Sequence, residues 1–203
     1  MRAAVSSWGW SSGSFLVLLL LAGEASADGI GAVAGLDVVE LTGDIPPVDS
    51  TLRLRPLLGA FYRWERGVML DVGITYVRRQ VDFDCGDRGC NEWIFDDLEI
   101  PIVGRLPLVT GDLRVLVHGA LVPWIVVRKR SVRQGKTDDL DSITDYDVAL
   151  AGGLGADYRV GRTRYGIELR GSVGVGGRAG PGYRDLEATS YAGYLLFTVV
   201  RER

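Results

Sequence analysis

Ser172, Glu168 and His118 are of the types that catalyse hydrolysis, and their strand parity predicts that all three face the same side of the sheet. His118 is the only histidine in the chain. In a hydrolase of this kind, serine is the nucleophile, histidine is the base, and a carboxylate orients the histidine. Ser172 and Glu168 would share one face of a strand, whereas His118 lies in a distant segment. Because nothing in the sequence places His118 beside them, we predict that the chain is not an enzyme. A lipid-modifying activity is the least favoured alternative.

Cys85 and Cys90, in the segment C-G-D-R-G-C, are the only two cysteines. Two thiolates and one histidine are fewer ligands than a structural zinc site needs, so we predict no metal and no other cofactor. In an oxidising compartment, cysteines at this spacing favour a disulfide. Such a bond would close a very short loop and would stiffen that loop more than it would stabilise the fold.

Residues 164–175, R-Y-G-I-E-L-R-G-S-V-G-V, alternate between apolar and polar or charged side chains. Tyr165, Ile167 and Leu169 share one parity, and Glu168 and Arg170 share the other. Successive side chains of a β-strand point to opposite faces, so this segment predicts a strand with one apolar and one charged face. In a soluble sheet the apolar face would be the core. In a membrane barrel the apolar face would meet lipid and the charged face would line the interior.

The start of the chain has the features of a cleaved signal peptide. Arg2 supplies a positive charge, residues 15–22 form an apolar run too short to cross a bilayer, and residues 25–27 (A-S-A) resemble a cleavage site. We therefore expect residues 1–27 to be a signal peptide and residues 28–203 to form one exported domain. The net charge of −3 and the lack of a basic block argue against nucleic acid as a partner.

Eight segments of the remaining chain have the composition of β-strands. Each provides the ~9–11 residues that a tilted strand needs to cross a bilayer, and no apolar run reaches the ~18–20 residues of a membrane-spanning helix. Short glycine-containing connections alternate with long polar loops, which is typical of outer-membrane barrels. The sequence therefore predicts an all-β fold: an eight-stranded antiparallel up-and-down transmembrane β-barrel preceded by a cleaved signal peptide. The expected strands are residues 29–41, 52–64, 68–79, 97–108, 113–127, 145–159, 164–176 and 188–201, and the expected long loops are 42–51, 80–96, 129–144 and 177–187.

One face of these strands carries nearly all of their charged residues. Arginine supplies the positive charges, whereas lysine occurs only at Lys129 and Lys136. Arginine suits desolvated pairing with carboxylates, and a narrow interior needs balanced charge because an unpaired buried charge is costly. We predict an ion-pair network in the lumen formed by Arg53, Arg55, Asp71, Glu99, Arg105, Arg114, Asp147, Glu168 and Arg170. The same face holds His118 and the charged residues Asp37, Arg63, Asp97, Asp157 and Arg164.

The opposite face carries aliphatic residues in its middle and aromatic residues near both strand ends. Two aromatic bands around an aliphatic belt are typical of membrane barrels, where they lie at the lipid–water interfaces. A soluble barrel such as a lipocalin could share the strand order, but it would scatter aromatic residues through its core. We therefore expect a location in the outer membrane of a Gram-negative bacterium, with outer-membrane lipid as a partner. The predicted aromatic girdle consists of Tyr62, Trp64, Tyr158 and Tyr165 at the short-turn side and of Tyr76, Tyr146 and Tyr191 at the long-loop side.

Residues 96–108, D-D-L-E-I-P-I-V-G-R-L-P-L, resemble the strand centred on L-E-I-P in the PorT-like outer-membrane β-barrel family. The apolar, glycine-containing strand that comes next in that family is similar to residues 115–124 here. Residues 147–170 resemble the family's later pair, a glycine-rich strand followed by a short turn and a strand of alternating charge. The resemblance implies an eight-stranded barrel of the OmpA/OmpX kind, with no catalytic residues.

These patterns favour a structural or surface-interaction role over transport. Eight strands leave an interior just wide enough for side chains to fill it, so we expect a plugged lumen. A small-solute pore or a ligand-binding barrel is the alternative function. The expected protein partners are the outer-membrane insertion machinery and a partner outside the cell that binds the long loops, since exposed loops on a rigid scaffold are common recognition sites.

Overall fold

A computed structural model of the protein describes residues 28–43, 54–66, 68–83, 91–133, 136–139, 146–175 and 188–203. Every regular element among these residues is a β-strand. The predicted signal peptide, Arg53 and the predicted disulfide between Cys85 and Cys90 lie outside the described residues. The strands are β1 (Gly29–Gly43), β2 (Arg55–Arg66), β3 (Val68–Phe83), β4 (Asn91–Glu99), β5 (Ile102–Val109), β6 (Leu113–Arg133), β7 (Lys136–Asp139), β8 (Tyr146–Val160), β9 (Thr163–Gly174) and β10 (Ala188–Glu202).

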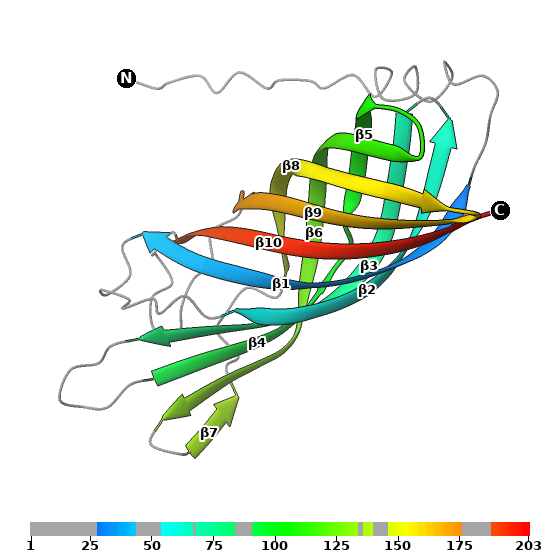
Figure 1. The fold of residues 1–203 in the computed structure, drawn as a ribbon. Coiled ribbons are helices and arrows are strands. Elements are labelled where there is room, and N and C mark those ends of the chain that lie inside the picture. The colour runs from blue at the N-terminus through cyan, green and yellow to red at the C-terminus, as the bar shows by residue number, and fades with distance from the viewer. Residues whose placement is uncertain are drawn as a thin grey trace, which may run out of the picture.

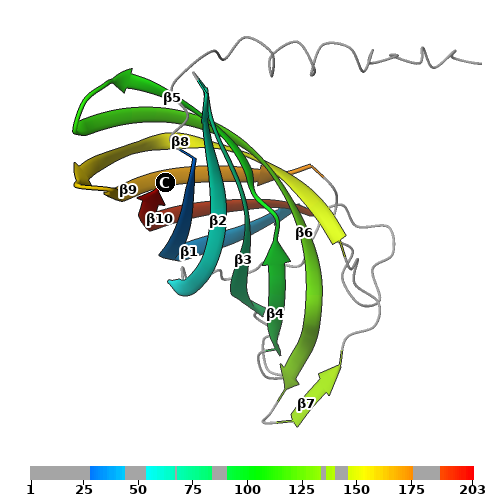
Figure 2. The same ribbon diagram turned by 90° about the vertical axis from the view of Figure 1, so that its right-hand side faces the viewer.

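The strands pair in antiparallel fashion and close into a barrel (Figures 1 and 2). β1 pairs with both β2 and β10, so the two ends of the sheet meet. β2 pairs with β3, and β6, β8, β9 and β10 pair in that order. β4 and β5 follow one another between β3 and β6 and together occupy one strand position. The predicted eight-stranded antiparallel up-and-down barrel is therefore confirmed.

The fourth barrel strand is interrupted, which corrects the prediction of one continuous strand over residues 97–108. β4 ends at Glu99 and β5 begins at Ile102. Pro101 has no N–H to donate to a neighbouring strand, so a regular ladder cannot run through it. The sheet is held at the interruption by two other bonds, from the Ile100 N–H to the Pro123 carbonyl (2.7 Å) and from the Gly73 N–H to the Pro101 carbonyl (3.1 Å).

Several strands extend further than predicted at the long-loop end. Residues 80–96 and 129–144 were expected to be loops, but β3 continues to Phe83, β4 starts at Asn91, and β6 continues to Arg133. β7 pairs with the end of β6. Figure 1 shows β4 and β7 projecting beyond the barrel. These extensions were missed because their sequences are polar, and pairing with a neighbouring strand determines their conformation.

Two of the predicted short turns contain glycine in a left-handed backbone conformation. Gly111, between β5 and β6, has a φ of 131°, and Gly161, between β8 and β9, has a φ of 62°. Glycine adopts positive φ without the steric cost that a side chain would add. These turns place the ends of four strands at the short-turn end of the barrel.

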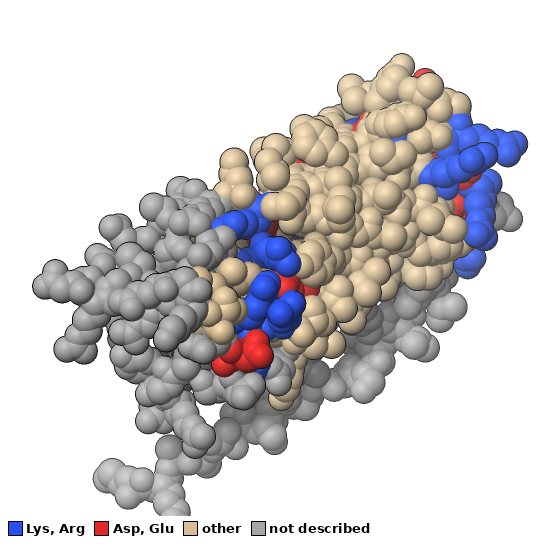
Figure 3. Space-filling view, turned by 90° about the horizontal axis from the view of Figure 1, so that it is seen from below, with Lys and Arg blue, Asp and Glu red and all other residues tan. Residues whose placement is uncertain are grey.

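The outer surface of the barrel is apolar. The outward-facing residues Leu58, Leu154 and Leu169 are 64%, 58% and 64% exposed. Figure 3 shows a broad uncharged band with basic side chains gathered at both of its ends. No helix in the described part of the chain is long and apolar enough to cross a membrane.

Candidate functional site in the barrel interior

Alternation along the barrel strands sends a large set of charged side chains into the interior. Each of these residues is less than a tenth exposed, and they share the interior with buried apolar side chains such as Leu57, Val77 and Leu196. Strand geometry accounts for the placement, because every second residue of a barrel strand faces inward. The buried, inward-facing ionisable residues are Asp37, Arg63, Asp71, Arg79, Asp97, Glu99, Arg105, Arg114, His118, Asp147, Asp157, Arg164 and Glu168.

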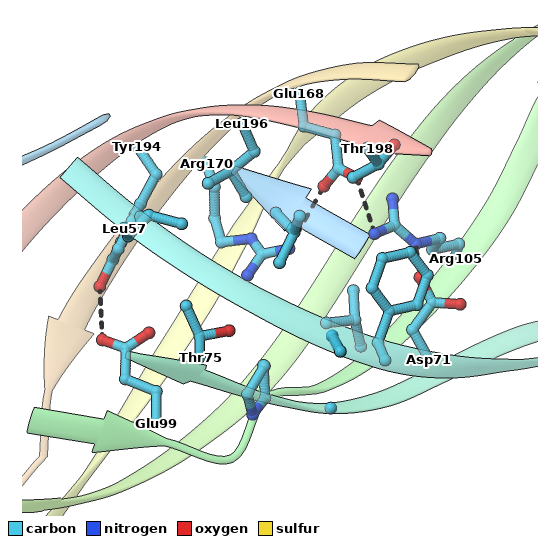
Figure 4. Close-up of a pocket in the computed structure, with 16 residues that line it drawn as sticks. Leu57, Asp71, Thr75, Glu99, Arg105, Glu168, Arg170, Tyr194, Leu196 and Thr198 are labelled. Carbon is cyan, nitrogen blue, oxygen red and sulfur yellow. Dashed lines mark hydrogen bonds and ion pairs between the residues drawn. The ribbon is translucent and has the colours of Figure 1, made fainter. Parts of the chain in front are cut away.

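Arg105 joins two carboxylates at the centre of the interior. Its Nε lies 2.7 Å from Oδ2 of Asp71, and its Nη2 lies 2.7 Å from Oε1 of Glu168. Arg170 donates a further hydrogen bond to Oε2 of Glu168 over 3.2 Å. These residues come from β3, β5 and β9, as the close-up in Figure 4 shows. One arginine therefore connects strands on different sides of the barrel.

A second group of ion pairs lies toward the short-turn end. Arg63 donates two hydrogen bonds to Asp71, over 2.7 and 2.8 Å. Asp157 accepts hydrogen bonds from Nε and Nη2 of Arg114, over 2.9 and 3.1 Å, and another from Arg164 over 2.9 Å. Arg63 also approaches Asp157 to 3.8 Å, which links this group to the central one. Bidentate arginine–carboxylate pairs of this kind are among the stronger polar interactions in proteins.

Arg79 organises a third group toward the long-loop end. Its guanidinium donates to Asp97 over 2.7 Å and to Glu99, and its Nε lies 3.6 Å from Asp37. The same guanidinium donates to the Tyr194 hydroxyl over 3.1 Å. Here one arginine meets three carboxylates, and Arg55 on β2 adds a second positive charge near Asp37. This group therefore combines positive and negative charges, as the other two do.

Little free space remains between these groups. A cavity of about 30 Å³ lies among Thr75, Glu99, Arg105, Arg170 and Tyr194, whose side chains appear in Figure 4. A second cavity of about 10 Å³ lies beside Arg79 and Tyr194. A space of this size holds roughly one water molecule. The side chains therefore fill the interior at this level, as expected for a narrow barrel.

The three residues with catalytic potential do not form a hydrolase triad. The structure does bring His118 near Glu168, with 3.9 Å between Nε2 and Oε2. Neither ring nitrogen of His118 has a hydrogen-bond partner among the described residues, and Ser172 shares a hydrogen bond with Tyr194. A serine nucleophile needs a hydrogen bond to its base, and Ser172 and His118 do not make one here.

The structure places the predicted lumen residues as follows. Asp71, Glu99, Arg105, Arg114 and Glu168 are buried and take part in the ion pairs described above. Arg170 joins them, Asp147 is buried and accepts a hydrogen bond from the Val148 N–H over 2.6 Å, and Arg55 is half-buried.

Sequence reasoning missed several residues of this interior, among them Arg79 and Tyr194, and also Glu65 and Glu202, which pair with Arg114 and Arg164. Arg79 is the last residue of the predicted strand, and it shares the parity of Asp71 on that strand. That parity was the available signal. Tyr194 has the opposite parity to Tyr191, which faces outward on the same strand, so parity was again the available signal.

The predicted girdle residues lie on the outer face. Six of them are between 37% and 70% exposed, and Tyr62 is half-buried. The rings of Tyr62 and Trp64 lie 4.6 Å apart. The exposed six are Trp64, Tyr76, Tyr146, Tyr158, Tyr165 and Tyr191.

Among the described residues, no group of three or more His, Cys, Asp or Glu side chains is placed to hold a metal ion.

Comparison with known proteins identifies the fold but no family. No family model and no curated protein matches the chain. Among solved structures, it is similar to Neisserial surface protein A, with a TM-score of 0.56 and 10% identity over 89% of this chain and 100% of that one. OprG from Pseudomonas aeruginosa (TM-score 0.48, 10% identity, 88% and 97% covered) and Ail of Yersinia pestis (0.45, 12%, 86% and 99%) are more distant. These neighbours are eight-stranded outer-membrane β-barrels. The likeness to Neisserial surface protein A shows that the two chains share this fold.

Proposed function

We propose that this chain is an integral protein of the outer membrane of a Gram-negative bacterium. Its lumen is closed by charged side chains, and it acts as a structural or surface-interaction element without enzymatic activity. The sharing of a fold with outer-membrane barrels supports this proposal. The resemblance of residues 96–108 and 147–170 to the PorT-like family points in the same direction, and membership of that family is part of the proposal.

The observation that carries the proposal is the inverted distribution of polarity. The outward-facing Leu58 and Leu169 are both 64% exposed, whereas the inward-facing Arg105 and Glu168 are both 3% exposed. A protein dissolved in water buries apolar side chains and rarely leaves a broad apolar surface exposed. In a bilayer the same surface is favourable, because lipid covers it and the closed barrel satisfies the backbone hydrogen bonds.

The packed interior supports a scaffold rather than a pore. Arg105 links Asp71 on β3 to Glu168 on β9, so a continuous channel would have to break these contacts. The cavity beside them measures only about 30 Å³. The proposed role is therefore mechanical: interior ion pairs hold the strands together, alongside a buried apolar cluster that includes Leu57, Val77 and Leu196.

We propose that a partner binds near the projecting ends of β3, β4, β6 and β7. β3 and β6 continue past the positions of Tyr76 and Tyr146, and β4 and β7 project beyond the barrel (Figure 1). A rigid sheet that lifts loops away from a membrane presents them to a partner outside the cell. Folding would also require contact with the outer-membrane insertion machinery.

Membrane fractionation tests the proposed function. The full chain, expressed in a Gram-negative host, should stay in the outer-membrane fraction after urea extraction. It should also migrate faster in a gel before heating than after heating, as folded barrels do. A peripheral protein released by urea in the same preparation is the control. Recovery of the folded protein as a soluble monomer without detergent would contradict the proposal.

A further inference from the structure

A β-bulge changes the direction of two arginines at the long-loop end of β6. Asp97 pairs with Val126, but the preceding Asp96 pairs with Arg128, so Val127 has no partner on β4. Trp124 and Val126 face the interior and are only 2% and 8% exposed. In a regular strand, Arg128 and Arg130 would follow them inward. The extra residue reverses this alternation and directs both arginines to the outer surface, an effect typical of bulges.

The redirected arginines join a compact group on the outer surface, which we call the rim cluster: Tyr76, Arg78, Asp96, Arg128 and Arg130. Asp96 accepts hydrogen bonds from Nε of Arg78 (2.6 Å), from the Tyr76 hydroxyl (2.7 Å) and from Nη2 of Arg130 (3.3 Å). Arg78 also donates to the Tyr76 hydroxyl over 3.3 Å. Arg128 is exposed and lies opposite Asp96 in the register. Three strands, β3, β4 and β6, therefore contribute to one cluster.

The rim cluster carries excess positive charge that is partly exposed. Three arginines face Asp96, and Asp139 of β7 lies opposite Arg130, so these five described side chains together carry one net positive charge. The side chain of Arg78 is 50% exposed and that of Arg130 is 20% exposed, whereas that of Asp96 is only 7% exposed. The carboxylate is thus covered and the guanidinium groups reach outward. Asp96 holds them in place, which lowers the entropy lost when they bind an anion.

The location of the rim cluster limits which ligands it can bind. Arg78 follows Tyr76 by two residues, on the long-loop side of the aromatic girdle. Basic side chains, with acidic side chains beside them, gather at this edge of the uncharged band in Figure 3. In a bilayer, residues just beyond such a girdle lie at the level of the lipid headgroups. Guanidinium groups bind phosphate with several parallel hydrogen bonds.

We propose that the rim cluster binds a phosphate of an anionic lipid headgroup in the outer leaflet, with Arg128, Arg130 and Arg78 as the donors. This inference rests on the proposed function, since it requires that lipid surround the barrel. Asp96 and Tyr76 position the arginines and do not contact the phosphate themselves.

Native mass spectrometry of the full chain in detergent, titrated with lipid A, tests this inference. The Arg128→Gln/Arg130→Gln variant removes two positive charges from the rim cluster. The control, Arg162→Gln/Arg201→Gln, removes two exposed charges from the short-turn end. Because a charge-assisted hydrogen bond contributes ~1.5–3 kcal/mol and 1.4 kcal/mol is tenfold, the rim variant should bind at least about tenfold more weakly. The control should bind as the unmodified protein does.

Two further arms identify the ligand. The first measures the affinity of the unmodified protein for lipid A that lacks its phosphates. This affinity should be about as low as the affinity of the rim variant for complete lipid A. Inorganic phosphate alone should not displace bound lipid, since the headgroup of a membrane lipid is the proposed ligand. Equal losses in the rim and control variants, an unchanged affinity of the rim variant, or displacement by inorganic phosphate would overturn the inference.

Heat-dependent gel migration separates failure of this inference from failure of the proposed function. If the unmodified protein and both variants fold and insert but show no preference for phosphorylated lipid, only the rim cluster proposal fails. If the unmodified protein does not insert at all, the proposed function fails as well.

Discussion

Arg105 on β5 and Glu168 on β9 form an ion pair inside the barrel, with 2.7 Å between Nη2 and Oε1. β6 and β8 separate their strands in the sheet, so the pair crosses the interior and does not follow the strand order. Both side chains are 3% exposed. A contact of this kind does two things at once: it connects distant strands, and it occupies the space through which a solute would have to pass.

Replacing the central arginine should destabilise the barrel strongly. Arg105→Ala leaves the buried carboxylates of Asp71 and Glu168 without their shared partner. Removing one member of a buried ion pair typically costs ~3–5 kcal/mol, because the remaining charge stays desolvated. The temperature at which the folded gel band disappears should therefore fall. Arg162→Ala, in the exposed turn after β8, is the control and should melt as the unmodified protein does. Equal melting of Arg105→Ala and the control would show that the pair is not structural.

Two neighbouring substitutions on β9 should differ in their effects. Glu168 forms ion pairs with two residues, Arg105 and Arg170. Arg170 forms its ion pair with Glu168, over 3.2 Å. Glu168→Ala leaves two facing guanidinium groups, so it should lower the melting temperature more than Arg170→Ala does. Glu168→Gln, which keeps the shape of the side chain, should fall between the two. Thermal melts followed by circular dichroism in detergent measure the order, and a reversed order would contradict the contact assignment.

Gly153 on β8 should not tolerate a side chain. A Cβ at this position would overlap the Leu169 carbonyl oxygen and would lie 2.8 Å from Nε2 of His118. The first of these is a backbone atom that cannot rotate away, and overpacking of this kind costs ~1–3 kcal/mol. Gly153→Ala should therefore lower the melting temperature. Gly171→Ala is the matched control, because a Cβ there meets nothing within 4 Å. A neutral Gly153→Ala would mean that the interior is less tightly packed than described.

The rim cluster should make stability depend on pH under acidic conditions. Burial raises the pKa of Asp96, but hydrogen bonds from Arg78 and Tyr76 outweigh it, so the pKa lies below its ordinary value of 3.8. A depressed carboxyl pKa stabilises the folded state above the unfolded-state value, and this contribution is lost as the pH falls through the folded-state value. The effect should be small, since the Arg78 side chain is 50% exposed and partly exposed pairs contribute little.

The difference in melting temperature between the unmodified protein and Asp96→Asn measures this contribution. It should be constant from neutral pH down to about pH 5 and should shrink below pH 3.8, the ordinary value of the group. A difference in melting temperature that grows as the pH falls would mean that the pKa of Asp96 is raised and not lowered. That result would contradict the assigned hydrogen bonds.

Alternation of side chains was enough to predict the class of fold. Residues 164–175 and the corresponding segments of the other strands keep a period of two, and that period assigned Leu169 to one face and Glu168 to the other. The interruption at Pro101 was missed because the flanking residues are apolar and keep the same pattern. The bulge at Val127 was missed for a related reason: it depends on how β4 and β6 pair, and a single sequence does not contain the register.

The composition of the interior was easier to predict than its contacts. Inward parity identifies Arg105 and Glu168 as residues of one lumen, but their strands are not neighbours, and the pair depends on the stagger of strands around the barrel. Arg128 and Arg130 show the limit of parity, since uninterrupted alternation would place both of them inside.

Planar-bilayer conductance tests the central claim most directly, because it asks whether the interior ion pairs close the lumen. Folded protein, verified by its heat-dependent migration, should insert without producing discrete conductance steps at high salt. Arg105→Ala, inserted in the same amount, is the informative comparison, since loss of the central bridge should allow at least transient current. Stable, stepwise conductance of the unmodified protein would contradict the account and would favour the small-solute pore.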